Sequence, residues 1–367
     1  MRVAIVGGVY GKPAAYRQGQ RITPEITLEE GLRQRGFDVS TFSHFTPIDC
    51  GSFDVVHVHH LSWGAMRVAA DRSQAAFVFT PHNPQYMSDS LPAHYRMSLK
   101  FVLRRADLIV ALTEKEKAFQ ETGYKVEGAT SVVIANGIPT DIYTMSGRKS
   151  RNPGAPWRIL YVGQLNAIKR VDILLEAVAR ISLPVKVTLV YQNAELESRL
   201  RSLASQLGIA DKVNFAGRRN PHELCQLYNE SDLFVLPSSG EALPSVVTEA
   251  MLCGTPIVAT DVGGIRQQLG GFGKLVPPNN SEALALAITE VLANYDQFES
   301  QAGEMSAYAQ RTFSVDAMVD QHIDWYRRLA VPVLRRRNRP FLAPGSSLAR
   351  FGLGVWPRAN AASGSRA

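Results

Sequence analysis

The segment that carries the most chemistry runs from residue 233 to residue 265, where a buried-strand pattern leads into polar side chains. A Pro-Ser-Ser-Gly turn precedes Glu241, and the pattern then predicts a helix beginning at Pro244 or Ser245. Unpaired backbone amides at a helix N-terminus suit a phosphate. Glu249, about one turn further in, can present its carboxylate to a diol such as a ribose, and Glu241 could hold a second polyol. One loop and one helix therefore offer sites for a phosphate and for two sets of sugar hydroxyls.

A second polar segment follows the predicted strand that ends at Gly163, and it places Lys169 and Arg170 just before a helix. Cations there could clamp a diphosphate and neutralise charge as a leaving group departs. The alternative is that Lys169 is a solvated cation near a helix start. A cation at a helix N-terminus opposes the macrodipole, so an anionic partner would explain its presence.

The elements that must position these residues alternate between strand-like and helix-like runs, which predicts parallel sheets covered by helices. In the first part of the chain the expected strands are 3–7, 37–42, 54–60, 75–83, 107–113 and 131–137, and the expected helices 24–36, 94–106 and 114–123. Residues 146–157, rich in Gly, Pro, Ser and charge, predict a linker. Beyond it the expected strands are 157–163, 185–191, 212–217, 232–238 and 255–261, and the expected helices 171–181, 194–207, 221–231, 244–254, 281–294, 300–310 and 315–329.

The fold class is therefore α/β, with two doubly wound Rossmann-like domains facing a cleft. In such open sheets, ligands bind outside the carboxyl ends of the strands, where the polar loops of this sequence also gather. We expect an N-terminal domain over 1–147, a linker over 148–157, a nucleotide-sugar-binding domain over 158–312, a helix over 313–330 and a basic, disordered tail over 331–367.

The charge distribution argues against a nucleic-acid partner, although the net charge of the 367 residues is +7. Nine arginines and no acidic residue lie between Arg327 and Ala367, so the rest of the chain carries 31 basic and 33 acidic residues. A protein that binds the phosphate backbone of a nucleic acid is expected to carry an excess of basic residues, and the rest of this chain does not. No apolar run approaches the length of a membrane span. Three widely spaced cysteines predict buried packing residues in a reducing compartment, without a disulfide framework.

Taken in order, these motifs resemble the retaining glycosyltransferases of family 4, which have the GT-B fold. The resemblance covers roughly residues 1–330. It is carried by the two glutamates with seven residues between them, followed by EAMLCGTPIVATDVGG, and by the Gly163, Leu165, Lys169 pattern. The segments ADLIVALT, VIANGIPTDIY and FSVDAMVDQHIDWYRRL add to it. The resemblance also implies that helix 313–330 crosses back to the N-terminal domain.

The resemblance implies roles for individual residues. His82, facing the transferred sugar, Glu241 and Lys169 are the expected catalytic residues, and no metal is expected. The expected donor-binding residues are Gly7, Gly8, Gly163, Gln164, Lys169, Arg170, Arg218, Ala242, Leu243, Pro244, Ser245 and Glu249. There are departures from the family pattern. Gln164 replaces a usual basic residue, and Ala242 replaces a common glycine.

Other features leave alternatives open. His57 and His59 share one face of a strand and could suggest a metal, but strand-end packing or acceptor lining fits them better. The basic helix over 94–107 is either a solvated face or a patch touching anionic lipid.

We therefore expect a metal-independent, retaining glycosyltransferase without a cofactor, which moves a sugar from a nucleotide-diphosphate donor, with UDP as the default, to an acceptor hydroxyl. The acceptor could be a lipid, a glycan or a small metabolite, and the expected context is glycolipid or polysaccharide biosynthesis. We expect a cytoplasmic protein able to contact the inner face of an anionic membrane. The alternatives are a GT-B-fold nucleotide-sugar epimerase and a non-catalytic nucleotide-sugar-binding protein.

Overall fold

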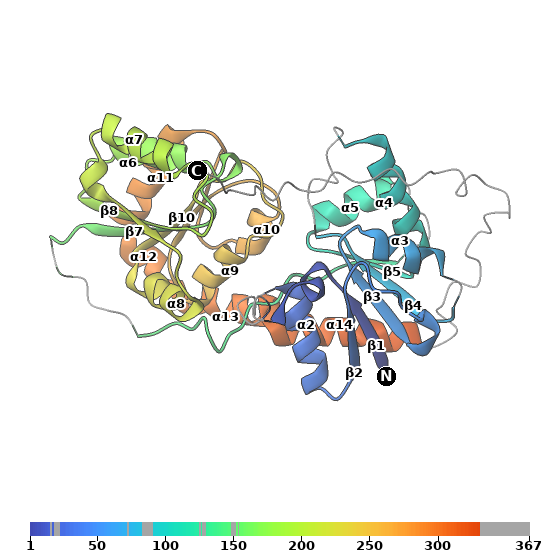
Figure 1. The fold of residues 1–367 in the computed structure, drawn as a ribbon. Helices are drawn as coiled ribbons and strands as arrows, with labels where there is room; N and C mark the ends of the chain where they lie inside the picture. Colours follow the sequence, from blue (N-terminus) through green and yellow to red (C-terminus); the bar gives the residue numbers. More distant parts are fainter. Residues whose placement is uncertain are drawn as a thin grey trace. The chain divides into compact units, whose positions relative to one another are not determined.

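A computed structural model of the chain contains two six-stranded parallel sheets, each built from consecutive strands and helices (Figure 1). The structure describes residues 1–14, 17, 23–71, 73–82, 91–124, 126, 130–147, 152 and 154–330. The predicted tail over 331–367 and most of the predicted linker lie outside the described residues. The predicted fold class, α/β with two Rossmann-like units, is confirmed.

The first sheet has the strand order β2-β1-β3-β4-β5-β6. Its strands are β1 (Arg2–Val6), β2 (Asp38–Phe42), β3 (Val55–His59), β4 (Ala76–Thr80), β5 (Leu108–Ala111) and β6 (Thr130–Val133). Its helices are α2 (Pro24–Gln34), α3 (Trp63–Ala70), α4 (Ala93–Arg105) and α5 (Glu114–Gly123). Every residue of β3, β4 and β5 is buried, as expected of central strands covered on both faces.

The second sheet has the order β12-β11-β10-β7-β8-β9. Its strands are β7 (Trp157–Val162), β8 (Val185–Val190), β9 (Val213–Gly217), β10 (Leu233–Leu236), β11 (Ile257–Thr260) and β12 (Lys274–Val276). The helices of this half are α6 (Val171–Arg180), α7 (Glu197–Gln206), α8 (Pro221–Glu230), α9 (Ser245–Leu252), α10 (Ile265–Leu269), α11 (Ser281–Ala293), α12 (Tyr295–Ser300) and α13 (Ala302–Phe313).

Local sequence signals fix where the functional helices begin. Asn220 and Glu223 form a reciprocal capping box at the start of α8, and Pro221 occupies its first turn. Pro244, with extended backbone, precedes α9. Apolar positions at helical spacing bury one face of α6, including Leu174.

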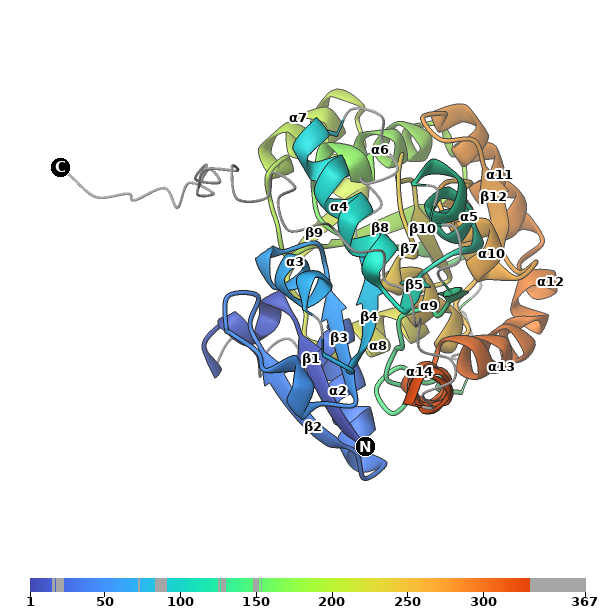
Figure 2. The ribbon, with the colours of Figure 1, turned by 90° about the vertical axis from the view of Figure 1, so that its right-hand side faces the viewer.

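The last helix, α14 (Val315–Ala330), belongs by its packing to the first sheet although it follows the second in sequence. It packs against α2 and β3, whereas the preceding α13 packs against α9. Figure 1 shows α14 beside α2 and β1, and Figure 2 shows α13 leading directly into it. Its buried side chains join one hydrophobic core with residues of β1 and α2: Met318, Val319, Ile323, Tyr326 and Leu329. This packing agrees with the course that the resemblance implied for the helix.

Most predicted elements match observed ones within a few residues. The sequence reading missed α3, the short helices α10 and α12, and the three-residue strand β12. The prediction that all three cysteines are buried packing residues is wrong for Cys225, which is half-buried. Its Sγ lies 3.9 Å from Sγ of Cys253, because α8 packs beside α9.

Candidate active site

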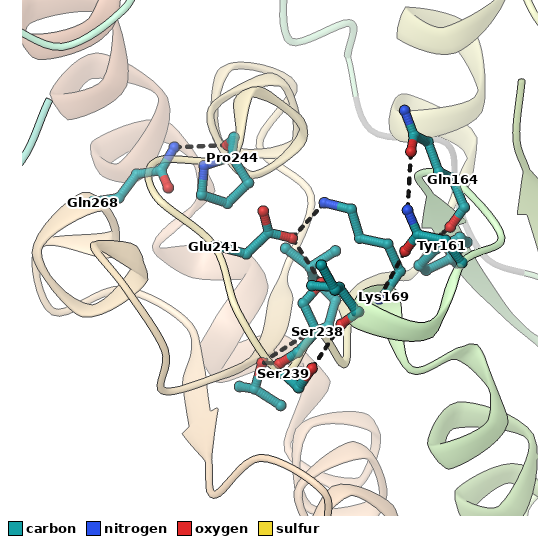
Figure 3. Close-up of polar contacts among 12 residues, drawn as sticks. Tyr161, Gln164, Lys169, Ser238, Ser239, Glu241, Pro244 and Gln268 are labelled. Atoms are coloured by element: carbon teal, nitrogen blue, oxygen red, sulfur yellow. Dashed lines mark hydrogen bonds and ion pairs between the residues drawn. The ribbon is translucent and has the colours of Figure 1, made fainter. Parts of the chain in front are cut away.

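The loop that follows β10 brings two predicted site residues into direct contact (Figure 3). Nζ of Lys169 lies 2.6 Å from Oε1 of Glu241, and the hydroxyl of Ser238 donates to the same oxygen at 2.7 Å. Both charged side chains are largely buried, with 21% of Lys169 and 10% of Glu241 exposed. Because a buried charge requires a partner, each of these two side chains stabilises the buried position of the other.

The anionic partner that the sequence demanded for Lys169 is therefore present within the protein. Sequence reasoning placed both residues in the site but did not foresee their ion pair, since 72 positions separate them. Glu241 thus supplies the negative charge beside Lys169, and no diphosphate is needed to explain a cation at this helix start. The role of Lys169 toward a diphosphate remains a prediction.

Backbone contacts join the Lys169 loop to the loop after β10. The amide of Ser239 donates to the carbonyl of Ile168 at 2.8 Å, and the side chain of Asn166 accepts from the amide of Lys169 at 3.2 Å. Arg170 then adopts a left-handed φ of 47°, a region that few residues other than glycine occupy. Such strain persists where the surrounding structure holds it, often at functional sites.

Two glycines allow a second segment to pass close behind Glu241. A Cβ added to Gly263 would lie 1.8 Å from the carbonyl oxygen of Glu241. The amide of Gly264 donates to the carbonyl of Ala242 at 2.8 Å. Gln268 donates to the carbonyl of Pro244 at 2.9 Å (Figure 3). The DVGGI stretch thus shapes the Glu241 loop, a role that the sequence reading did not assign to it.

Glu249 lies one turn into α9, as predicted, but its side chain is buried, with 4% of the residue exposed. The hydroxyl of Tyr228 donates to its Oε2 at 3.1 Å. Burial raises the pKa of Glu249 to about 7, and the hydrogen bond from Tyr228 partly opposes that rise. The ribose role of Glu249 stays a prediction, and no motif in the sequence pointed to Tyr228.

The remaining donor-binding candidates of the second half lie around the same strand ends. Gln164 is exposed, and its carbonyl accepts from the hydroxyl of Tyr161 at 2.8 Å. The guanidinium of Arg170 bonds the carboxylate of Asp172 at 3.0 Å. Other predicted residues of this half are Gly163, which directly follows β7, exposed Arg218 after β9, half-buried Ala242 and Leu243, and exposed Ser245, the first residue of α9.

In the first half, Gly7 and Gly8 follow β1 as predicted. The amide of Gly7 already donates to the carbonyl of Phe42 at 3.0 Å, so this N–H is not free for a phosphate. A Cβ at Gly7 would lie 2.9 Å from Cγ of Glu25, a contact that favours glycine there. The absence of a side chain at Gly7 therefore leaves room for Glu25, and the donor-binding role of Gly7 stays a prediction.

His82 lies two residues beyond β4 and belongs to a group of histidines. Nε2 of His82 lies 2.7 Å from Nδ1 of His59, whose ring stacks on that of His57 with centroids 4.2 Å apart. The two strand histidines therefore share one face, as predicted. Burial lowers the pKa of His82 to about 3 and that of His322 to about 4. At neutral pH these imidazoles carry no charge.

The described residues include no group of three or more His, Cys, Asp or Glu side chains placed to hold a metal ion. Within the same residues, none of the helices has both the length and the apolar character needed to cross a membrane. Metal independence remains a prediction.

Two Rossmann-like halves, with polar side chains beyond the carboxyl ends of their parallel strands, define the GT-B fold. Solved structures share this fold. Sucrose-phosphate synthase from Thermosynechococcus elongatus has a TM-score of 0.75 and 20% identity, covering 90% of this chain and 99% of its own. Anabaena HepE in complex with UDP has a TM-score of 0.73 and 19% identity, covering 89% and 100%.

The chain belongs to glycosyltransferase family 4. Residues 47–142 match the family model described as Glycosyltransferase Family 4, and residues 146–312 match Glycosyl transferases group 1. The D-inositol 3-phosphate glycosyltransferase of Corynebacterium jeikeium is 30% identical over 318 residues, which are 79% of this chain and 75% of that protein. The enzyme of the same name from Geodermatophilus obscurus is 30% identical, over 81% and 71%. The protein is a glycosyltransferase.

Proposed function

We propose that this glycosyltransferase transfers a sugar from a nucleotide-diphosphate donor, with UDP as the first candidate, to an acceptor hydroxyl with retention of the anomeric configuration. The observation that carries the proposal is the ion pair between Lys169 and Glu241 beside the start of α9. The pair supports the proposal because the family pattern expects a cation for the diphosphate and a carboxylate for the sugar in these loops.

The chemistry assigned to these residues is electrostatic. A bound diphosphate would compete with Glu241 for the ammonium of Lys169, which would then neutralise charge on the departing phosphate. The amides at the start of α9, near Ser245, would add to this stabilisation. The carboxylate of Glu241, released from Lys169, would accept from hydroxyls of the transferred sugar. The departing phosphate oxygen can take the acceptor's proton, so the reaction needs no carboxylate nucleophile.

The other roles follow the family pattern. Glu249 would hold the ribose, for which its side chain must become accessible from the buried position beside Tyr228. His82 would face the transferred sugar from the first half. No metal is required, because Lys169 and the helix terminus supply positive charge.

The acceptor is a hydroxyl compound of glycolipid or polysaccharide biosynthesis in this proposal. A second acceptor class, an inositol phosphate, is favoured by the names of the relatives at 30% identity. The arginine-rich C-terminal segment supports contact with an anionic membrane from the cytoplasmic side, since the nine arginines between Arg327 and Ala367 are not offset by any acidic residue.

A thermal-shift screen of the full chain against UDP, GDP, ADP and their common sugars tests the donor. We expect one nucleotide family to raise the melting temperature by several degrees. Proton NMR of the product, made from that donor with inositol phosphate or a glycolipid acceptor, then reports the anomeric configuration. Absence of stabilisation by every nucleotide sugar would refute the donor proposal, and an inverted anomeric centre would refute retention.

A further inference from the structure

His82 lies two residues beyond β4, with its backbone held at a left-handed φ of 53°. Its Nε2 is 2.7 Å from Nδ1 of His59, with the two rings inclined by only 10°. Within the described part of the chain, Nδ1 of His82 has no hydrogen-bond partner. One ring nitrogen of His82 is thus engaged inside the protein, and the other makes no hydrogen bond to the residues that the structure describes.

The partner, His59, is held rigidly at the end of β3, where 2% of the residue is exposed. Its ring stacks on His57, which bonds the hydroxyl of Tyr326 at 2.6 Å and that of Thr80 at 2.7 Å. The carbonyl of His59 accepts from Nε2 of His44 at 2.9 Å. Both the ring and the backbone of His59 are therefore fixed before any substrate binds.

The unused nitrogen of His59 decides which of the two imidazoles donates. Nε2 of His59 is buried and has no hydrogen-bond partner among the described residues, and His59 lines a cavity of about 10 Å³ together with Thr80 and His322. If Nε2 of His82 donated to Nδ1 of His59, a neutral His59 would carry its single ring hydrogen on Nε2. That N–H would be buried without an acceptor. Orphaned buried N–H groups are rarer than unsatisfied acceptors. The arrangement in which His59 donates from Nδ1 leaves only a lone pair in the cavity.

We propose that His59 is a positioning residue that donates Nδ1–H to Nε2 of His82 and so fixes the hydrogen of His82 on Nδ1. His82 then presents Nδ1–H, a donor, to a hydroxyl oxygen of the transferred sugar. This inference rests on the proposed function, in which His82 faces that sugar. A donor held in one tautomer needs no reorganisation when charge develops in the transition state.

The tautomer can be measured without substrate. In protein labelled with ¹⁵N-histidine, long-range proton–nitrogen NMR spectra distinguish protonated from bare imidazole nitrogens, and loss of signals in His82→Gln assigns His82. We expect the wild-type protein to show His82 protonated on Nδ1 and bare at Nε2. A wild-type His82 protonated on Nε2 would overturn the proposal.

Turnover by two His59 variants then tests the consequence. His59→Leu removes the donor, and we expect His82 to become a mixture of tautomers, with kcat lower by roughly tenfold and donor KM within about twofold. His59→Asn places an amide donor near the Nδ1 position, and we expect it to restore kcat to within about threefold of wild type. His222→Leu, on exposed α8, is the matched control.

The outcomes distinguish a failure of the positioning role of His59 from a failure of the proposed role of His82. If His59→Leu turns over like the wild type, or if His59→Asn is as slow as His59→Leu, the positioning role is refuted. If His82→Ala is fully active although the wild-type tautomer is as expected, His82 does not contact the transferred sugar as the proposed function states. The expected effect of the tautomer on kcat is then refuted as well. If His59→Leu does not fold, the tautomer of the wild type and the kcat of His59→Asn still decide.

Discussion

The polar clusters of the two halves occupy equivalent places, beyond the carboxyl ends of parallel strands, but they differ in charge. The first half holds neutral histidines, including His59 and His82, whose pKa values burial lowers. The second half holds an ion pair between Lys169 and Glu241. Neutral imidazoles need only hydrogen bonds when buried, whereas buried ions need each other.

In the proposed function, this difference assigns different ligands to the two halves. The charged pair exchanges one partner for the diphosphate of the donor. The neutral histidines orient hydroxyl groups of a sugar or an acceptor without attracting a phosphate. The comparison makes opposite predictions for the pH dependence of the two halves, and it predicts that crowding the charged pair is costly.

The largest effect is expected from crowding the charged cluster. Gly263→Ala would place a Cβ 1.8 Å from the carbonyl of Glu241 at a φ of 58°, and we expect a loss of about 3 kcal/mol or more in unfolding free energy. Gly271→Ala is the control, because Gly271 also has positive φ but has no atom within 4 Å of its Cβ. Urea unfolding measures both, and equal losses would contradict the crowding argument.

Glu249 is expected to make the second half less stable as pH rises. Its folded pKa of about 7 lies above the ordinary 4.5, so its contribution is fully present below pH 4.5 and is lost as pH rises through 7. The loss amounts to roughly 3 kcal/mol. Glu249→Gln should remove this slope, whereas exposed Glu304→Gln should keep it. Unfolding free energies between pH 5 and 8 check this, and an unchanged slope in Glu249→Gln would refute the burial argument.

The histidine cluster is expected to show the opposite slope. The folded pKa of His322, about 4, lies below the ordinary 6.5, so its contribution is present above pH 6.5 and is lost as pH falls toward 4. His322→Asn, which can still donate to the carbonyl of Met318, should flatten this loss only in part, because His57, His59 and His82 remain. Unfolding at pH 4.5 to 7 measures it, with exposed His222→Asn as control. A slope as steep as the wild type's would contradict the account.

The smallest effect is expected from metal removal. Since Lys169 and the start of α9 supply the positive charge, a chelator should leave activity within error of the untreated enzyme. The assay is turnover after dialysis against EDTA, with added zinc or magnesium as the comparison. A complete loss of turnover that either metal restores would show that Lys169 and the start of α9 do not supply all of the positive charge that the reaction needs.

The sequence predicted elements whose pattern is long and periodic, such as α6 and α14, and strands made of unbroken apolar runs, such as β10. It missed α3, whose eight residues, WGAMRVAA, show little alternation of polar and apolar positions, and β12, which has only three residues. Short elements take their conformation from tertiary contacts rather than from their own periodicity.

For the site, the sequence located individual residues but not their partners. It assigned Lys169 and Glu241 to one predicted site, and it put His57 and His59 on one face of a strand. It could not join His57 to Tyr326, 269 positions away, or Glu249 to Tyr228, because such pairs depend on how whole elements pack. The neutral state of the histidine cluster also follows from burial, which no local motif encodes.

Titration calorimetry on two matched lysine variants tests the central claim that Lys169 belongs to a donor site. Lys274 forms a surface ion pair with Glu290 at the same 2.6 Å, in the same half of the molecule. With the nucleoside diphosphate that most stabilises the wild type, we predict that Lys169→Ala weakens binding by about tenfold or more and that Lys274→Ala leaves it unchanged. Equal affinity of both variants and the wild type would contradict the account.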